Sequence, residues 1–325
     1  MEDTMLEDRI ARGIAARADA LGLDADRLRV TYVLNWGGFV NRSYHVTDGR
    51  RRYHLKLSDA AETLPGLQRW RGVHELLTAR YHAPEMVDWI ALPDLGLEGP
   101  LFRHVDGAVP EVRSPELLAA VAPVIERLHG DGELAAHIAS DEAPRPCRDT
   151  FLETYAGRFR EDLAFVSAHR PGFVSPGTLA YIRGQADALE VEVHAHPAFA
   201  EPGTSPIHAD LWLENLLLDG DGRWWVLDWD GLTVGDPAID WAMLLGPTTR
   251  DLAPLDISTL PPDVATDAGL RSRLPIYARA SLLDWALDPL ADWIDADAVP
   301  EHTAAVRAEK ERQHLAALAL YRATY

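Results

Sequence analysis

The chain has 325 residues, of which 47% are apolar and 25% charged, enough to bury the core of one large domain or two smaller ones. Its formal charge is −20, which argues against a nucleic-acid partner, because nucleic-acid binding relies on basic patches. A generally solvated acidic surface accounts for this charge, and a cationic small substrate would also suit it.

The single cysteine, Cys147, leaves no partner for an intrachain disulfide. No stretch approaches the ~18 apolar residues of a membrane span. The charged start MEDTMLEDRIARG lacks the apolar core of a secretory signal. We therefore expect a cytoplasmic protein without a membrane partner. The sequence does not indicate an oligomeric state.

The first hundred residues are rich in predicted strands. The spacing of leucine and isoleucine predicts a helix over residues 5–21. Alternating apolar residues and intervening turn signals then predict strands and one helix (63–81), the strands being 29–34, 42–47, 51–57, 85–91 and 100–105.

From residue 115 onward the pattern is mostly helical, and the final helices are expected at about 271–288 and 300–322. Pro289 should end the first of these two helices. The switch from strands to helices predicts an α+β protein of two lobes. The small lobe would cover residues 1–100, a hinge residues 101–107, and the large lobe residues 108–325.

Residues 208–231, HADLWLENLLLDGDGRWWVLDWDG, place polar groups among leucine and tryptophan. The turn Gly220-Asp221-Gly222 between two apolar runs predicts a hairpin. Such a hairpin would bring three side chains to one mouth, those of Asp210, Asn215 and Asp228. An acid, an amide and a second acid suit phosphoryl transfer, because one carboxylate can accept the proton of an attacking hydroxyl while the other oxygens hold Mg²⁺.

Two features of the first lobe fit a nucleotide. Lys56 is one of only two lysines among 31 basic residues, and a compact ammonium suits a phosphate pocket. Gly37 and Gly38 permit close approach of the backbone to phosphates, with Phe39 as a lid, although an ordinary hairpin turn has the same signature. No GxxxxGK[ST] motif is present, so a P-loop kinase is not indicated.

The order of these motifs resembles the aminoglycoside phosphotransferase/choline kinase-like family, which has a protein-kinase-like fold. The pieces that carry the resemblance span most of residues 30–245: NWGGFVNRSYHV (35–46), YHLKLS (53–58), PLFRHVDG (100–107), IERLHG (125–130), the His208-x-Asp210-x4-Asn215 loop, Asp228 and GLTVGDPAIDWAMLL (231–245).

The resemblance implies a kinase that uses ATP or GTP with Mg²⁺ to phosphorylate a hydroxyl of a small molecule. Its implied site residues are Asp210 as catalytic base, Asn215 and Asp228 as metal ligands, and, around the nucleotide, Gly37, Gly38, Phe39, Lys56 and the backbone of Arg103 and Val105. In that family a glutamate on the next helix pairs with the lysine. Neither Glu62 nor Glu75 clearly takes that place.

Several residues keep two interpretations. By resemblance His208 braces the loop backbone, and Asp230 is either a second metal carboxylate or a solvated loop acid. Asp236 and Asp240 are expected to support a loop and cap a helix. On the acceptor side, Asp284 and Asp288 stand four residues apart beside Trp285, which fits either an acceptor site or a solvated acidic face.

Two other functions remain open. A metallohydrolase could use His194, His196, His208, Asp210 and Asp228 as metal ligands. That arrangement leaves Lys56 and Asn215 without a role. A catalytically silent nucleotide-binding protein of the same fold is the other alternative. The acceptor could be an aminoglycoside, another antibiotic, an amino alcohol, an amino sugar or another metabolite.

Overall fold

The computed structural model describes residues 2–34, 41–59, 61, 63–139, 144–247, 255, 257–298 and 302–325. The chain forms two compact units. The first comprises Met1–Ala108 and Leu217–Gly231, and the second Val109–Leu216 and Leu232–Tyr325. The predicted hairpin therefore belongs to the first unit, although residues of the second unit precede and follow it in sequence. A hinge at residues 101–107 stays a prediction.

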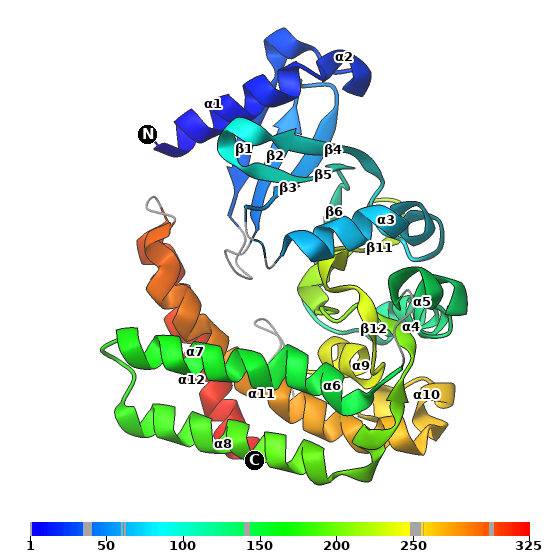
Figure 1. Cartoon of the computed structure of the whole chain (residues 1–325), viewed down its shortest axis with the longest axis vertical. Helices are drawn as coiled ribbons and strands as arrows, with labels where there is room; N and C mark the ends of the chain where they lie inside the picture. Colours follow the sequence, from blue (N-terminus) through cyan, green and yellow to red (C-terminus); the bar gives the residue numbers. More distant parts are fainter. Residues whose placement is uncertain are drawn as a thin grey trace. The chain divides into compact units, whose positions relative to one another are not determined.

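An antiparallel five-stranded sheet in the order β1-β2-β3-β5-β4 forms the first unit (Figure 1). Its strands are β1 (Arg29–Val33), β2 (Arg42–Thr47), β3 (Arg52–Leu57), β4 (Met86–Leu92) and β5 (Leu97–Arg103). All five lie where the alternating pattern predicts them. The predicted first helix is divided into α1 (Glu2–Ala15) and α2 (Ala18–Leu21), and the predicted second helix is α3 (Leu64–Arg80).

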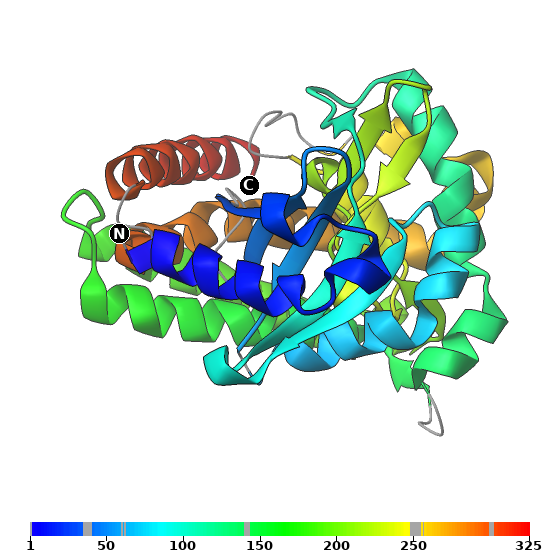
Figure 2. The ribbon, with the colours of Figure 1, turned by 90° about the horizontal axis from the view of Figure 1, so that it is seen from above.

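The two faces of this sheet have different neighbours. Helix α1 lies along one face (Figure 2), where Ile10 and Ile14 pack into a buried cluster with Val46, Leu55 and other side chains of the sheet. Because successive side chains of a strand point to opposite faces, the residues next to Leu55 point away from α1. The alternation therefore sends Lys56 to the face opposite the apolar core.

Helix α3 packs on that second face, where the ring of Trp70 lies 4.4 Å from the ring of Phe102 on β5. A three-stranded sheet in the order β11-β10-β6 completes the unit. Its strands are β6 (Gly107–Ala108), β10 (Leu216–Asp219) and β11 (Trp224–Val226). The predicted hairpin is thus confirmed, and Gly222 in its turn has the positive φ of 79° that favours glycine.

The second unit is mainly helical. Its helices are α4 (Pro115–His129), α5 (Gly132–Ala139), α6 (Cys147–Phe151), α7 (Gly157–His169), α8 (Pro176–Ala195), α9 (Ala238–Leu245), α10 (Pro262–Thr266), α11 (Ala268–Asp295) and α12 (Thr303–Thr324). Its short strands are β7 (Arg145–Pro146), β8 (Pro202–Gly203), β9 (Ser205–Ile207) and β12 (Thr233–Gly235).

Helix α11 is the centre of this unit and packs against α7, α8, α9 and α12. The prediction that Pro289 ends it is wrong, because α11 continues to Asp295 with Pro289 buried in its interior. A proline forfeits one backbone hydrogen bond inside a helix. Packing of the apolar residues around Pro289, such as Leu287 and Leu290, outweighs that loss.

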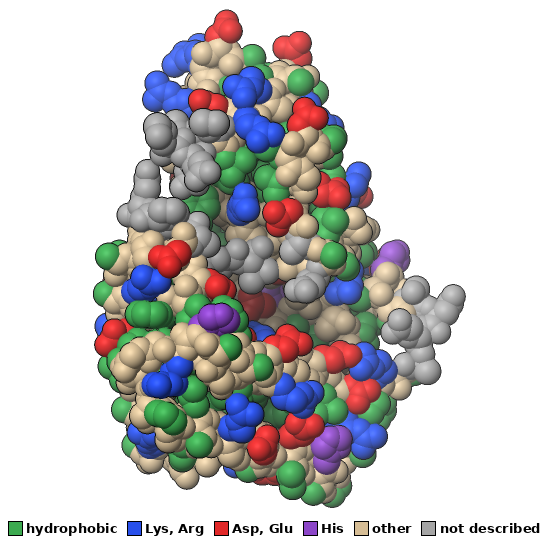
Figure 3. Space-filling view, turned by 60° about the vertical axis from the view of Figure 1, so that its left-hand side comes forward, with side chains coloured by type: hydrophobic (Ala, Val, Ile, Leu, Met, Phe, Trp, Pro, Cys, Tyr) green, Lys and Arg blue, Asp and Glu red, His purple; other side chains and the backbone are tan. Residues whose placement is uncertain are grey.

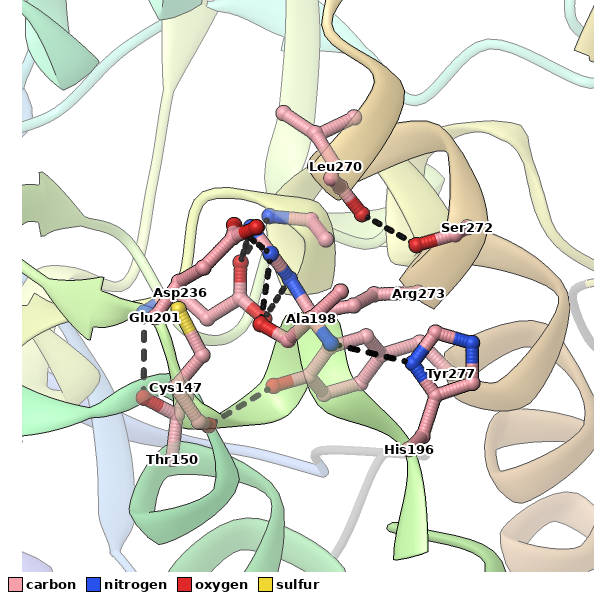
Figure 4. Close-up of polar contacts among 12 residues, drawn as sticks. Cys147, Thr150, His196, Ala198, Glu201, Asp236, Leu270, Ser272, Arg273 and Tyr277 are labelled. Atoms are coloured by element: carbon pink, nitrogen blue, oxygen red, sulfur yellow. Dashed lines mark hydrogen bonds and ion pairs between the residues drawn. The ribbon is translucent and has the colours of Figure 1, made fainter.

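A buried ion pair joins α11 to the loop before α9 (Figure 4). Nε of Arg273 lies 2.8 Å from Oδ2 of Asp236, and Nη1 of Arg273 lies 2.6 Å from Oε2 of Glu201. The Asp236 carboxylate also accepts the N–H of Ala238 at 3.0 Å, and its own N–H donates to Oγ1 of Thr150. These contacts confirm the expected supporting role of Asp236.

Acidic and basic side chains are interspersed on the face shown in Figure 3. Among the helices that the structure describes, none has both the length and the apolar character needed to cross a bilayer.

Candidate active site

Lys56 on β3 is the cation of a group of polar residues within the first unit. It is 7% exposed and contacts two carboxylates, since its ammonium pairs closely with Oδ1 of Asp228 and lies 2.8 Å from Oδ2 of Asp230. Burial is the largest influence on the pKa of Lys56 and lowers it, but the two carboxylates together outweigh burial and raise the pKa. Lys56 is therefore a fixed positive charge at neutral pH.

The backbone around Asp228 is held in an unusual conformation. Asp228 has a φ of 59°, in the left-handed region that non-glycine residues rarely adopt. The strand that leads to it is anchored by His82, whose carbonyl oxygen accepts the N–H of Val226 at 3.1 Å and whose Nδ1 donates to the carbonyl of Trp224 at 2.7 Å. Left-handed residues outside glycine concentrate at functional sites, which marks Asp228 independently of its sequence motif.

Asp230 is fixed from three sides. Its Oδ2 accepts hydrogen bonds from Nζ of Lys56 at 2.8 Å and from Nδ2 of Asn41 at 3.0 Å. Its carbonyl oxygen lies so close to α3 that a Cβ added at Gly66 would be 2.3 Å away. Burial, followed by the charge of Asp228, raises the pKa of Asp230 to about 6. Of the two interpretations left open for Asp230, a solvated loop acid does not fit this environment.

Three histidines on the Lys56 face of the sheet were not found from the sequence. His45 and His54 are paired across β2 and β3, with ring centres 6.1 Å apart, and the ring of His104 lies 5.1 Å from that of His45. Burial, followed by the charges of His45, Lys56 and His104, lowers the pKa of His54 to about 4, so its imidazole is neutral at neutral pH. The β2–β3 register accounts for the pair His45 and His54, whereas His104, just after β5, joins them only through the tertiary fold.

The loop after β9 carries two predicted site residues of the second unit, Asp210 and Asn215. Asn215 donates from Nδ2 to the carbonyl oxygen of Asp210 at 2.7 Å and to its Oδ2 at 2.8 Å. These two bonds fix the Asp210 carboxylate. They also turn the amide oxygen of Asn215 away from Asp210, because the oxygen and nitrogen of an amide point in different directions.

Asp240 on α9 supports this loop by hydrogen bonds to its backbone. Its fully buried carboxylate accepts hydrogen bonds from the backbone N–H groups of His208 at 2.9 Å and Ala209 at 2.8 Å. It also accepts a hydrogen bond from Nε2 of His129 at 2.9 Å. Ala209 needs that support, because its φ of 62° is strained for alanine. His208 is fully buried and its Nδ1 accepts the N–H of Asp210 at 3.2 Å, which confirms its bracing role.

An ionic cluster joins α7 and α11 within the same unit. Arg158 lies 2.5 Å from Oδ2 of Asp284, 3.4 Å from Oδ1 of Asp288 and 4.0 Å from Oδ2 of Asp162. Three carboxylates around one guanidinium leave an excess of negative charge. Asp284 is buried and paired, so the interpretation of Asp284 as part of a solvated acidic face is wrong.

This cluster has unused polar atoms. Neither Oδ1 of Asp284 nor Nε1 of Trp285 has a hydrogen-bond partner among the residues that the structure describes. Burial, offset in part by Arg158 and reinforced by Asp288 and Asp162, raises the pKa of Asp284 to about 7. A ligand that offers a cation or an N–H or O–H donor would satisfy that free oxygen.

Aromatic residues connect the cluster to the loop that carries Asp210. The ring of Trp285 lies edge-on 5.1 Å from the ring of Trp212, two residues after Asp210. Tyr155 donates or accepts a hydrogen bond with Ser281 at 2.7 Å. Its pKa is raised by burial first and then by the charges of Asp284 and, to a smaller extent, Asp210. Tyr155 lies in a turn of π-helix, Leu152–Ala156, between α6 and α7, a feature that is frequent at functional sites.

The other residues predicted around the nucleotide, and the two glutamates considered as partners of Lys56, are placed as follows in the structure. Gly37, Gly38, Phe39 and Glu62 lie outside the described residues. Glu75 is exposed on α3, whereas Lys56 is buried against Asp228 and Asp230. The N–H of Arg103 donates to the carbonyl of Glu85 at 2.8 Å and is already used within the sheet. Val105 follows β5 in a half-buried connection.

The metallohydrolase alternative lacks a coordination set. His194 is exposed at the end of α8, and Nδ1 of His196 accepts the N–H of Ala198. In the part of the chain that the structure describes, no three histidine, cysteine or acidic side chains are grouped to hold one metal ion. His194 therefore faces solvent, and His196 caps the 3-10 turn Pro197–Ala200.

A small antiparallel-sheet unit, a largely helical unit and a braced Asp–Asn loop together define a protein-kinase-like α+β fold with the parts of a small-molecule phosphotransferase. Residues 31–261 match the model of the Phosphotransferase enzyme family, and the chain belongs to this family. That assignment replaces the metallohydrolase alternative. No curated protein sequence matches the chain.

Solved structures share the fold at low sequence identity. A choline kinase from Streptococcus pneumoniae is 14% identical with a TM-score of 0.60, and the match covers 97% of this chain and 99% of that one. An ethanolamine kinase from Plasmodium vivax is 15% identical with a TM-score of 0.55, covering 93% and 84%. The aminoglycoside phosphotransferase APH(4)-Ia is 18% identical with a TM-score of 0.53, covering 92% and 95%.

Proposed function

We propose that this protein is a cytoplasmic kinase that transfers the γ-phosphoryl group of a nucleoside triphosphate, with the help of Mg²⁺, to a hydroxyl of a small molecule. The observation that carries the proposal is the double hydrogen bond from Asn215 to Asp210. It holds a carboxylate in one orientation at the start of a braced loop, as a base that must meet a hydroxyl requires.

Asp210 is the proposed base. The attacking hydroxyl donates a hydrogen bond to the Asp210 carboxylate and passes its proton there as the bond to phosphorus forms. Asn215 keeps the carboxylate from rotating, and Asp240 keeps the loop backbone in place through the N–H groups of His208 and Ala209. Catalysis then rests on positioning, since phosphoryl transfer needs little covalent help from the protein.

The residues fit a magnesium ion by their chemistry. The amide oxygen of Asn215 and the carboxylate of Asp228 are the hard oxygen ligands that Mg²⁺ prefers. When bound, the ion would neutralise charge on the phosphate oxygens. Lys56, a buried permanent cation, would bind a phosphate oxygen of the nucleotide.

The cluster of Arg158, Asp162, Asp284 and Asp288 is the proposed acceptor site. It lies in the same unit as Asp210 and is linked to it through Trp212 and Trp285. Its excess of carboxylates and its two aromatic rings favour an acceptor with an ammonium group. The structurally similar proteins include a choline kinase, an ethanolamine kinase and a protein solved with GDP and kanamycin.

A panel assay tests the proposal. The purified protein is incubated with Mg²⁺ and either ATP or GTP, together with aminoglycosides, macrolides, sugars or amino alcohols, and release of nucleoside diphosphate is measured. We expect acceptor-dependent turnover that falls at least about a hundredfold in Asp210→Asn, while nucleotide affinity changes little. Equal turnover in the variant would refute Asp210 as the base.

The same assay separates an enzyme from a silent nucleotide-binding protein. Tight nucleotide binding without turnover on any acceptor, in both the unmodified protein and Asp210→Asn, would support the silent alternative.

A further inference from the structure

Lys56 needs a partner that keeps its ammonium in one place while a nucleotide binds. By resemblance, a glutamate on the following helix has this role. Glu75 on that helix is exposed, and the buried ammonium of Lys56 instead contacts Asp228 and Asp230. Asp228 is also the proposed ligand of the magnesium ion. Asp230 is therefore the described carboxylate that can stay with Lys56 after the metal binds.

The surroundings of Asp230 suit a positioning role better than metal binding. Oδ2 of Asp230 already accepts two N–H donors, Nζ of Lys56 at 2.8 Å and Nδ2 of Asn41 at 3.0 Å. An oxygen that bonds two N–H donors has little capacity left for a cation. Among the described residues, the N–H donor that contacts the Asp228 carboxylate is Lys56, on Oδ1.

The backbone of Asp230 is also locked. It lies in the short 3-10 turn Trp229–Gly231, whose Trp229 is fully buried and donates from its indole to the carbonyl of Val226 at 2.8 Å. The first turn of α3 covers the Asp230 carbonyl at Gly66, where no larger residue fits without a shift. Helix α3 therefore contacts the backbone of Asp230, and the Asp230 side chain in turn contacts Lys56.

We propose that Asp230 is the positioning residue of Lys56, in place of a glutamate on α3, and that it leaves Asp228 to the metal. The inference rests on the proposed function, since it assigns Lys56 to a nucleotide phosphate. It predicts that α3 controls nucleotide binding through Gly66 and Asp230.

A double-mutant cycle tests this inference with Mg²⁺–ATP binding, measured by calorimetry, as the readout. Asp230→Asn should weaken binding about tenfold in the unmodified protein, the effect of losing one charge-assisted hydrogen bond. In the Lys56→Met background the same change should weaken binding no further, because Asp230 acts through the lysine. Equal weakening in both backgrounds would overturn the proposal.

The magnesium requirement separates positioning from metal binding. In Asp230→Asn the Mg²⁺ concentration for half-maximal binding of ATP should stay within about twofold of that of the unmodified protein. In Asp228→Asn it should rise at least about tenfold, because a ligand is lost. A similar rise in Asp230→Asn would overturn the proposal. Asp230→Glu should recover part of the lost affinity, since it keeps the carboxylate.

A charge-neutral variant covers the case in which Asp230→Asn does not fold. Gly66→Ala places a methyl group against the Asp230 carbonyl, whereas Gly72→Ala on the same helix meets nothing within 4 Å. We expect Gly66→Ala to weaken Mg²⁺–ATP binding at least about threefold and Gly72→Ala to leave it unchanged. Unchanged binding in both variants would overturn the link through α3. Lack of any nucleotide binding by the unmodified protein would instead refute the proposed function.

Discussion

Asp284 is a buried carboxylate with one paired oxygen and one oxygen available to a ligand. Its Oδ2 is held by Arg158, while its Oδ1 has no partner among the described residues. Desolvation opposes ionisation of such a group, and an incoming cation favours it. The charge of Asp284 should therefore depend on pH and on the acceptor within the neutral range.

The stability of the folded protein should reveal this titration. The pKa of Asp284 is about 7 in the folded protein and 3.8 in its ordinary state. A raised pKa contributes stability that is present below the unfolded value, and this contribution is lost as pH rises towards 7. Asp284→Asn cannot ionise, so its free energy of unfolding relative to the unmodified protein should improve by at least about 1 kcal/mol between pH 4 and pH 8. Urea unfolding at several pH values measures the difference, and a constant difference would contradict a raised pKa.

The same residue should affect acceptor binding. With a cationic acceptor found in the panel assay, Asp284→Asn should raise the acceptor KM about tenfold and leave the nucleotide KM unchanged. Asp297→Asn, an exposed acid outside the cluster, is a suitable control. A KM that rises equally for a neutral sugar would argue against recognition of an ammonium group.

At the scale of whole elements, helix α9 positions the loop of Asp210 in the second unit, and the five-stranded sheet positions Lys56 in the first. Asp240 is the first-turn acid of α9, and it binds the two N–H groups of the strained loop that ends at Asp210. Two of the described non-glycine residues with positive φ are Ala209, next to Asp210 in the second unit, and Asp228 in the first unit. These conformations persist because the surrounding hydrogen bonds hold them.

Removing the loop support should cost both stability and turnover. Asp240→Ala leaves the buried N–H groups of His208 and Ala209 without an acceptor, at about 1–3 kcal/mol each. We expect a loss of about 3 kcal/mol in the free energy of unfolding and a lower kcat. Denaturant unfolding and initial rates measure the two effects. Asp221→Ala, in the exposed hairpin turn, should change neither.

The histidine face of the sheet gives a second prediction at this scale. His54 precedes Lys56 by two residues on the same face, about 7 Å along the strand, so a base whose phosphates contact Lys56 could stack there. His54→Ala should weaken ATP binding about tenfold, as loss of one aromatic stacking partner does, and leave inorganic tripolyphosphate binding unchanged. The exposed His137→Ala is the control. Equal weakening of both ligands would contradict base stacking.

The sequence predicted the elements whose periodicity is regular, and it missed features that depend on tertiary contacts. Alternating residues located β1–β5, and Gly220-Asp221-Gly222 located the hairpin. The predicted helix end at Pro289 was wrong, because its buried neighbours keep α11 continuous. Asp230 as the partner of Lys56 was missed, because the two residues are 174 positions apart and only the folded unit brings them together.

For the whole molecule, the interrupted order of the two units has consequences for folding. The segment Leu217–Gly231 completes the first unit and supplies both carboxylates that neutralise Lys56. It also supplies Trp229, which is fully buried and lies 6.1 Å from the ring of Tyr81. Neither unit is therefore a continuous stretch of chain.

A fragment of residues 1–108 should not fold stably on its own. It would keep the five-stranded sheet but leave the Lys56 ammonium buried without a counter-charge, at a cost of about 3–5 kcal/mol. Circular dichroism with thermal unfolding tests this, and the full-length chain is the reference. A cooperative transition in the fragment, similar to that of the full chain, would show that the segment is dispensable.

The scarcity of lysine has a practical consequence. Lys310 is as inaccessible as Lys56, with its ammonium 2.5 Å from Asp292. The native surface consequently offers no lysine amine to acylating dyes or crosslinkers, although denaturation exposes both. Uptake of such a reagent at these two positions, read by mass spectrometry, would count unfolding events directly. Slower uptake at Lys56 with nucleotide present would indicate that the bound nucleotide protects this lysine.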